Sequence, residues 1–263
     1  MLRYLRVATA AWIMTLLFCF IPLNTVDWVG WIGNLEHMYR TVQAHVSAAE
    51  AESSDTSTLY EEDPPESETG ALSGSGIPST DAALRAAGLV DIQEIDPTIL
   101  VELKYATSDN FTGRPLYRSS RCYLQKDVAL RLAKVQKYLR LQGLGLKIWD
   151  GYRPLSVQRE LWKAASDKRF IADPRYGSNH NRGAAVDCTL VNLKGEELPM
   201  PSRFDSFNRN AHRWLLSMEQ EAHQNSIILE AAMRRAGFVP LAFEWWHFDA
   251  PDARKYPVLD IPL

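Results

Sequence analysis

Four residues in the second half of the chain have the types and spacing of a catalytic metal site. His180 and Asp187 are seven residues apart, and Glu244 and His247 are three residues apart. A catalytic zinc ion takes three protein ligands and keeps a fourth position for water, which needs a nearby base to accept its proton. The two histidines and Asp187 can supply the ligands, and Glu244 can supply the base. This pattern predicts the chemistry of a zinc hydrolase.

The charge of the predicted ligand set suits this chemistry. Two neutral imidazoles and one carboxylate leave a bound divalent cation about one unit positive, which favours hydroxide over water. The pKa of bound water can fall from about 15.7 to about 7, and at about 1.36 kcal/mol per unit this stabilises hydroxide by about 12 kcal/mol. A single side chain does not reach such a value.

The neighbours of these residues support a metal site and also allow a simpler interpretation. Asp187 lies in the run of small and β-compatible residues 183–188, where an unpaired carboxylate is costly to bury. Glu244 and His247 stand among four aromatic residues at 243–248, which would form a dry wall that strengthens local electrostatic interactions. In the simpler interpretation, each ionisable group makes an ordinary hydrogen bond and residues 243–248 form an aromatic core strand.

Six short motifs follow one another along the C-terminal part of the chain. They are Leu103-Lys104-Tyr105-Ala106-Thr107, Asn110-Phe111-Thr112-Gly113, Trp149-Asp150-Gly151-Tyr152-Arg153-Pro154, Ser178 to Asp187, Arg203-Phe204-Asp205 and Glu244-Trp245-Trp246-His247. In order and spacing, over about residues 90–263, they resemble the D-alanyl-D-alanine dipeptidases, a zinc family whose best-known member supports vancomycin resistance. The resemblance implies a zinc D,D-peptidase-like fold with one Zn²⁺ per chain.

The resemblance also implies a catalytic role for each residue that matches a family motif. His180, Asp187 and His247 match the zinc ligands. Glu244 matches the base that activates the water and then protonates the departing amine. Arg153 matches the arginine that stabilises the tetrahedral anion, although it also fits a structural cation at a strand-to-helix turn, since the proline after it suits a first helical position.

Three further residues match substrate-binding positions of the family. Tyr105 and Asp205 match groups that hold the free ammonium of the substrate, and Ser178 matches a group near its carboxylate. The simpler interpretations are a core tyrosine at the end of an apolar strand and a serine that forms a turn before a metal ligand.

One cysteine departs from the family pattern. Cys188 directly follows the predicted ligand Asp187, and strand alternation should turn its thiol to the opposite face. Cys122 and Cys188 could pair outside the cytoplasm, but the sequence does not show whether they approach each other.

The activity implied by the resemblance is zinc-dependent hydrolysis of the D-Ala-D-Ala dipeptide, in turnover of cell-wall peptides or recycling of D-alanine, with peptidoglycan fragments as further partners. One alternative is a zinc D,D-carboxypeptidase that trims the stem peptides of peptidoglycan. Another is a non-catalytic module that contains zinc and binds the wall. The presence of both Glu244 and Arg153 argues against the non-catalytic module.

The hydrophobic pattern of residues 82–263 predicts an α+β fold, in which helices pack on a mixed or antiparallel sheet. Because Glu244 and His247 would point to opposite faces of a regular strand, we expect a bulge or turn between them. The expected helices are a segment carrying Val128, Leu132, Val135 and Leu139, a segment from Pro154 to about Ala165, and one ending near Gly237. The expected strands are Ile99 to Tyr105, Lys147 to Asp150, Ala184 to Leu190 and Phe238 to Phe248.

The first 30 residues are expected to be a signal peptide or a membrane anchor. Residues 7–23 form an uncharged run that would span about 25 Å as a helix, against a hydrocarbon core of about 30 Å. Arg3 and Arg6 precede the run, so the positive-inside tendency places the rest of the chain outside the cytoplasm, in the periplasm. Aromatic residues beyond the run favour an uncleaved anchor.

The segment between this hydrophobic stretch and the folded part is expected to be a tether. Residues 31–46 form a juxtamembrane segment, and residues 47–80 contain eight acidic residues and no lysine or arginine, which predicts a disordered linker. The expected catalytic domain, residues 82–263, follows this linker. Residues 85–263 have a net charge of only +5, which excludes a nucleic-acid footprint.

Overall fold

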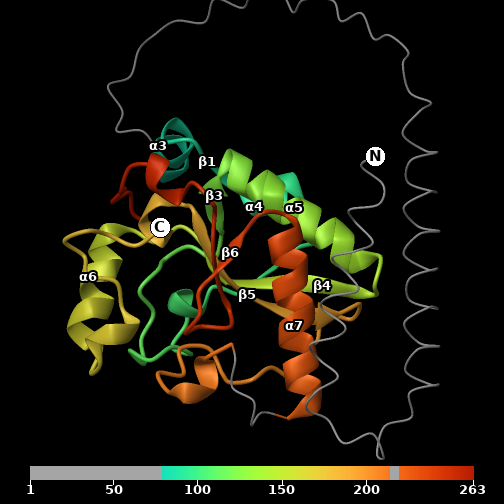
Figure 1. Ribbon diagram of the computed structural model, residues 1–263. Helices are drawn as coiled ribbons and strands as arrows, with labels where there is room; N and C mark the ends of the chain where they lie inside the picture. Colours follow the sequence, from blue (N-terminus) through green and yellow to red (C-terminus); the bar gives the residue numbers. More distant parts are fainter. Residues whose placement is uncertain (1–78, 214–218) are drawn as a thin grey trace, which may run out of the picture. The chain divides into compact units, whose positions relative to one another are not determined.

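A five-stranded mixed sheet organises the fold (Figure 1), and the computed structural model describes residues 79–213 and 219–263. The strand order in the sheet is β2-β4-β5-β7-β6. Strand β2 runs parallel to β4, and the other neighbouring strands are antiparallel. The strands are β2 (Leu100–Val101), β4 (Leu144–Asp150), β5 (Ala185–Asn192), β6 (Val239–Pro240) and β7 (His247–Asp249).

A small second sheet and five α-helices complete the secondary structure of the described residues. The second sheet pairs β1 (Leu89–Asp91) with β3 (Tyr123–Gln125) in antiparallel orientation. The helices are α3 (Thr80–Ala86), α4 (Ile92–Ile95), α5 (Lys126–Arg140), α6 (Leu155–Ala164) and α7 (Gln220–Arg235). Short 3₁₀ turns lie at Lys104–Ala106, Lys168–Phe170, His180–Arg182, Arg209–Ala211 and Ala253–Lys255. The α+β prediction is confirmed.

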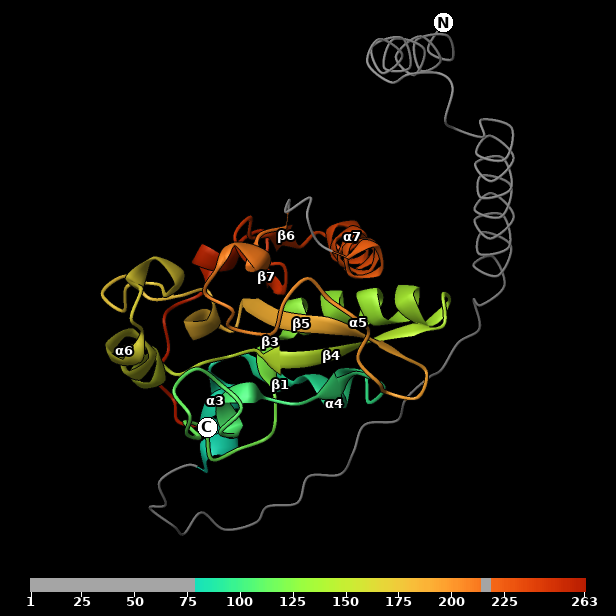
Figure 2. The ribbon, with the colours of Figure 1, turned by 90° about the horizontal axis from the view of Figure 1, so that it is seen from below.

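The main core lies between the central strands and the long helices. Strands β4 and β5 lie side by side at the centre of the sheet (Figure 2), and α5 packs against both β4 and α7. The apolar residues of α5 recur at helical spacing and are buried in one cluster with those of β4 and β5: Val128, Leu132, Val135, Leu139, Leu146, Ile148, Cys188 and Leu190. Because side chains alternate along β5, Asp187 and Thr189 point to the opposite face. That second face carries the site described below.

Two of the predicted strands were too long. Between Ile99 and Tyr105 only Leu100–Val101 is a strand, and Tyr105 lies in a 3₁₀ turn. The backbone carbonyl of Tyr105 accepts hydrogen bonds from the backbone N–H groups of the loop residues Leu116 and Tyr117. These long-range bonds replace the ladder bonds of a strand. The other expected elements are confirmed in position, including the three helices.

The predicted last strand, Phe238 to Phe248, is interrupted. Its two ends form β6 and β7, and the residues between them form turns. The backbone N–H of Trp245 donates to the carbonyl of Ala211, far away in the sequence, at 2.9 Å. The expected turn between Glu244 and His247 is confirmed.

The predicted N-terminal segments lie almost entirely outside the described residues. These are the signal or anchor at 1–30, the juxtamembrane segment at 31–46 and most of the linker at 47–80. Within the parts of the chain that the structure describes, no helix has both the length and the apolar character needed to cross a membrane.

Candidate active site

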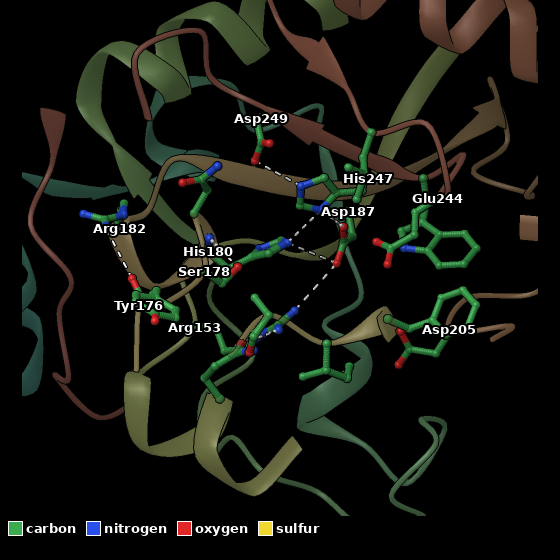
Figure 3. A pocket seen from close by; sticks show the side chains of 18 of the residues that line it. Arg153, Tyr176, Ser178, His180, Arg182, Asp187, Asp205, Glu244, His247 and Asp249 are labelled. Atoms are coloured by element: carbon green, nitrogen blue, oxygen red, sulfur yellow. Dashed lines mark hydrogen bonds and ion pairs between the residues drawn. The ribbon is translucent and has the colours of Figure 1, made fainter. Parts of the chain in front are cut away.

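The pairing of β5 with β7 brings together the two sequence segments that carry the predicted metal ligands. Asp187 on β5 lies directly opposite His247 on β7. His180 lies in the 3₁₀ turn that precedes β5 and is buried. Three side chains from two distant parts of the sequence therefore converge on one point (Figure 3).

A glycine makes the approach to β5 possible. Gly183 ends the 3₁₀ turn with φ of 63°, a left-handed conformation that glycine adopts without steric cost. A Cβ atom at this position would lie 2.3 Å from the side chain of Leu89 and 3.2 Å from the backbone nitrogen of Gln125. The turn that places His180 beside Asp187 thus depends on a residue without a side chain.

The donor atoms of His180, Asp187 and His247 have the separations of ligands around one ion. His180 Nε2 lies 3.1 Å from His247 Nδ1 and 3.4 Å from Asp187 Oδ2, and His247 Nδ1 lies 2.9 Å from Asp187 Oδ1. Tetrahedral zinc with bonds of about 2.0–2.1 Å holds its ligand atoms about 3.3 Å apart. The residues present therefore fit a single zinc ion.

The outer nitrogen of each histidine has a hydrogen-bond acceptor. His180 Nδ1 donates to the carbonyl oxygen of Gly151 at 2.8 Å, and His247 Nε2 donates to Asp249 Oδ1 at 3.0 Å. Such bonds orient metal-binding imidazoles and leave the inner nitrogens, His180 Nε2 and His247 Nδ1, for the ion.

The surroundings of His247 favour a positive charge. Burial lowers the pKa of His247, but hydrogen bonds to Asp187 and Asp249 outweigh burial and raise this pKa to about 10. Burial of Asp187 acts to raise its pKa, but the nearby His180 and His247 outweigh burial and lower it. An anionic pair of carboxylates around two imidazoles is a natural place for a cation.

Glu244 lies in the turn between β6 and β7 and faces the same point. Figure 3 shows its carboxylate directed toward Asp187 and His247. Neither carboxylate oxygen has a hydrogen-bond donor among the described residues, and burial raises the pKa of Glu244 to about 7. A carboxylate with this pKa can accept and release a proton near neutral pH.

Arg153 is fixed at the edge of the pocket by two neighbours. It follows β4, and its Nε and Nη2 donate to Asp150 Oδ2 at 2.9 and 2.6 Å, while Nη1 donates to Gln158 at 2.8 Å. Its Nη2 lies 3.8 Å from Asp187 Oδ2, and its guanidinium lies 4.9 Å from the ring centroid of Tyr105. The structural and the catalytic interpretations of Arg153 are therefore compatible.

The predicted substrate-binding residues line a pocket of about 540 Å³ together with the three predicted metal ligands. Tyr105 is buried and donates to Asp205 Oδ2 at 2.8 Å, and burial raises the pKa of Asp205 well above its usual value. Ser178 Oγ accepts a hydrogen bond from the backbone of His180 at 3.2 Å. Figure 3 shows Ser178 and Asp205 on opposite sides of the group formed by His180, Asp187 and His247.

The cysteines take no part in this site. Cys122 and Cys188 are both buried and free. Cys188 belongs to the core cluster on the other face of β5, as strand alternation predicted, and burial raises the pKa of its thiol.

Asp150 and Asp249 also belong to the site, although the motifs in the sequence did not indicate them. Asp150 lies within the motif that contains Arg153, and its type and distance of three residues could have indicated an ion pair. Asp249 follows His247 by two residues in β7, so both side chains lie on one face of the strand. The spacing of two residues between His247 and Asp249 is the feature of the sequence that could have indicated this contact.

Comparison with known proteins agrees with this geometry. A family model described as D-ala-D-ala dipeptidase matches residues 85–260. The chain belongs to this family. A D-alanyl-D-alanine dipeptidase of Escherichia coli (strain K12) is 43% identical over 171 residues, which cover 65% of this chain and 89% of that protein. Another from Enterococcus faecium is 32% identical over 200 residues, covering 67% of this chain and 98% of that protein. As a member of the D-ala-D-ala dipeptidase family, the protein is a metallo-dipeptidase.

Proposed function

We propose that this dipeptidase hydrolyses D-Ala-D-Ala with one zinc ion per chain, bound by His180, Asp187 and His247. The observation that carries the proposal is the convergence of the three donor atoms at separations of 2.9 to 3.4 Å. The hydrogen bonds made by the outer nitrogens of the two histidines and the membership of the family support it. A bound zinc ion supplies Lewis acidity and lowers the pKa of water to about 7.

Glu244 would transfer the proton, and Arg153 would stabilise the negative charge that develops in the reaction. Glu244 accepts the proton of the attacking water and delivers it to the departing amine, a task that suits its raised pKa of about 7. Arg153 lies close to Asp187 and stabilises the oxyanion that develops on the scissile carbonyl. The loss of such a contact typically costs about 3–4 kcal/mol of transition-state stabilisation.

The two ends of the pocket would hold the two ends of the dipeptide. Asp205, supported by the Tyr105 hydroxyl, pairs with the ammonium group, because a cation restores the charged form of this buried carboxyl. Ser178 binds the carboxylate group of the dipeptide on the other side of the three proposed zinc ligands. A small pocket that places a carboxylate, a metal ion and a hydrogen-bond donor in line then selects a short peptide with both termini charged.

The test combines metal analysis with substrate choice. The purified protein should contain one zinc per chain and cleave D-Ala-D-Ala, whereas the Glu244→Gln variant should keep zinc and lose about 10²- to 10⁴-fold in kcat. Turnover by the variant at the unaltered rate would contradict the role of Glu244. Cleavage of a pentapeptide ending in D-Ala-D-Ala, without cleavage of the dipeptide, would instead identify a D,D-carboxypeptidase.

We also propose that the enzyme acts in the periplasm, anchored by residues 7–23, in turnover of cell-wall peptides or recycling of D-alanine. The basic start and uncharged run of the sequence support this location. Alkaline phosphatase fused after residue 263 should be active in cells, and replacing Arg3 and Arg6 by glutamate should reduce that activity. An inactive fusion that is fully expressed would refute export.

A further inference from the structure

A second cavity lies next to the substrate pocket on the same face of the sheet. It measures about 760 Å³, and Trp149, Thr189 and Phe204 are among its lining residues. Thr189 follows Asp187 by two residues in β5, so the two side chains point to the same face. Asp205 lines both cavities. The second cavity therefore begins where the proposed ammonium site ends.

Phe204 lines the second cavity and packs against the wall of the substrate pocket. Its centroid lies 5.7 Å from that of Tyr105 and 5.8 Å from that of Trp246, and both of these residues line the substrate pocket. The centroid also lies 5.5 Å from that of Trp149, which lines the second cavity. Phe204 thus packs against residues from the walls of both cavities.

The second cavity contains a hydrogen-bonding group that no protein atom uses. Thr189 is fully buried, and among the described residues its hydroxyl is the one buried side-chain polar atom without a partner. Two other polar groups of the cavity are occupied, since Trp149 Nε1 donates to Glu197 at 3.2 Å and Lys104 donates to Asp109 at 2.9 Å. A hydroxyl both donates and accepts, so it suits a neutral amide better than an ion.

We propose that Phe204 determines specificity: its ring supports the wall that Tyr105 and Trp246 form in the substrate pocket, keeps the amino side closed toward the second cavity and so restricts the enzyme to dipeptides with a free amino group. This inference rests on the proposed function. An acyl group on the substrate nitrogen would have to extend beyond Asp205 toward the second cavity, which Phe204 also lines. If the ring is removed, the wall of Tyr105 and Trp246 loses its support, and the acyl amide gains access to the cavity that Thr189 lines.

The test is a gain of activity, which an unfolded variant cannot produce. The full-length Phe204→Ala variant should raise the ratio of kcat/KM for N-acetyl-D-Ala-D-Ala over D-Ala-D-Ala by about tenfold or more. Phe207→Ala is the matched control, because its ring packs on Phe111 and Phe170 instead, at 5.0 and 5.3 Å. This control should leave the ratio unchanged.

A second substitution tests the role of the buried hydroxyl. In the Phe204→Ala background, Thr189→Val should lower kcat/KM for the N-acetyl substrate about fivefold and leave that for the free dipeptide unchanged. Zinc content confirms folding, and Phe204→Leu replaces the alanine variant if that variant loses zinc.

The outcomes separate this inference from the proposed function. A wild-type enzyme that does not cleave D-Ala-D-Ala refutes the proposed function. A wild-type enzyme that cleaves the free dipeptide, together with a zinc-loaded Phe204 variant whose substrate ratio is unchanged, refutes the specificity role alone. Wild-type cleavage of both substrates at equal kcat/KM refutes it as well.

Discussion

Asp249 accepts a hydrogen bond from His247 Nε2 at 3.0 Å, and this bond turns His247 Nδ1 toward His180 and Asp187. Both residues lie in β7, two positions apart, so the strand itself holds the carboxylate and the imidazole on one face. The orientation of His247, a proposed zinc ligand, is thereby built into the backbone of a three-residue strand.

Removal of this carboxylate should weaken metal binding. Asp249→Ala should lower zinc affinity about 10- to 100-fold, because the imidazole of His247 loses the bond that fixes its orientation and tautomer. Competition with a chelator of known affinity measures the change. The exposed Asp252, in the loop after β7, provides a control as Asp252→Ala. Equal zinc affinity in the Asp249 variant and the wild type would remove Asp249 from the site.

The activity should decline in acid because Glu244 must be deprotonated to act as a base. Burial raises the pKa of Glu244 to about 7, and a bound cation favours the carboxylate, so the midpoint should lie at or below about pH 7. Below the midpoint, kcat/KM should fall about tenfold per pH unit, while zinc content is monitored in parallel. A profile that rises toward acid with zinc still bound would assign the proton transfer to another group.

The guanidinium shape of Arg153 should matter more than its charge. Arg153→Lys keeps a cation beside the buried Asp150 but cannot reproduce the bonds to both Asp150 and Gln158. We expect kcat to fall about 10²- to 10³-fold with a much smaller change in KM. Arg159→Lys, at an exposed position of α6, is the control. A variant that changes only KM would place Arg153 in substrate binding rather than in catalysis.

Gly183 should tolerate no side chain. Gly183→Ala combines the left-handed backbone with contacts of 2.3 and 3.2 Å, so it should reduce the free energy of unfolding by about 2–5 kcal/mol. Gly143 has φ of 74°, and no described atom lies within 4 Å of the place that a Cβ would take, so Gly143→Ala should lose only about 1–2 kcal/mol. Denaturant unfolding monitored by circular dichroism compares the two. Equal losses would show that the space around Gly183 adapts.

The sequence by itself determined which residue types meet at the candidate site and most of the regular elements. His180, Asp187, Glu244 and His247 could be predicted because each stands in a short motif whose residue types suit one kind of metal chemistry. The helix α5 could be predicted because its apolar residues repeat with a helical period, which is a local property of the chain.

The tertiary structure alone decided how these parts meet. The strand predicted from Ile99 to Tyr105 was too long because distant loop residues donate hydrogen bonds to the backbone carbonyl of Tyr105. The contacts of Phe204 with the walls of both cavities and the unpaired hydroxyl of Thr189 depend on rings and strands that are far apart in the sequence. Local periodicity contains no information on such contacts, since packing between distant elements sets them only when the chain has folded.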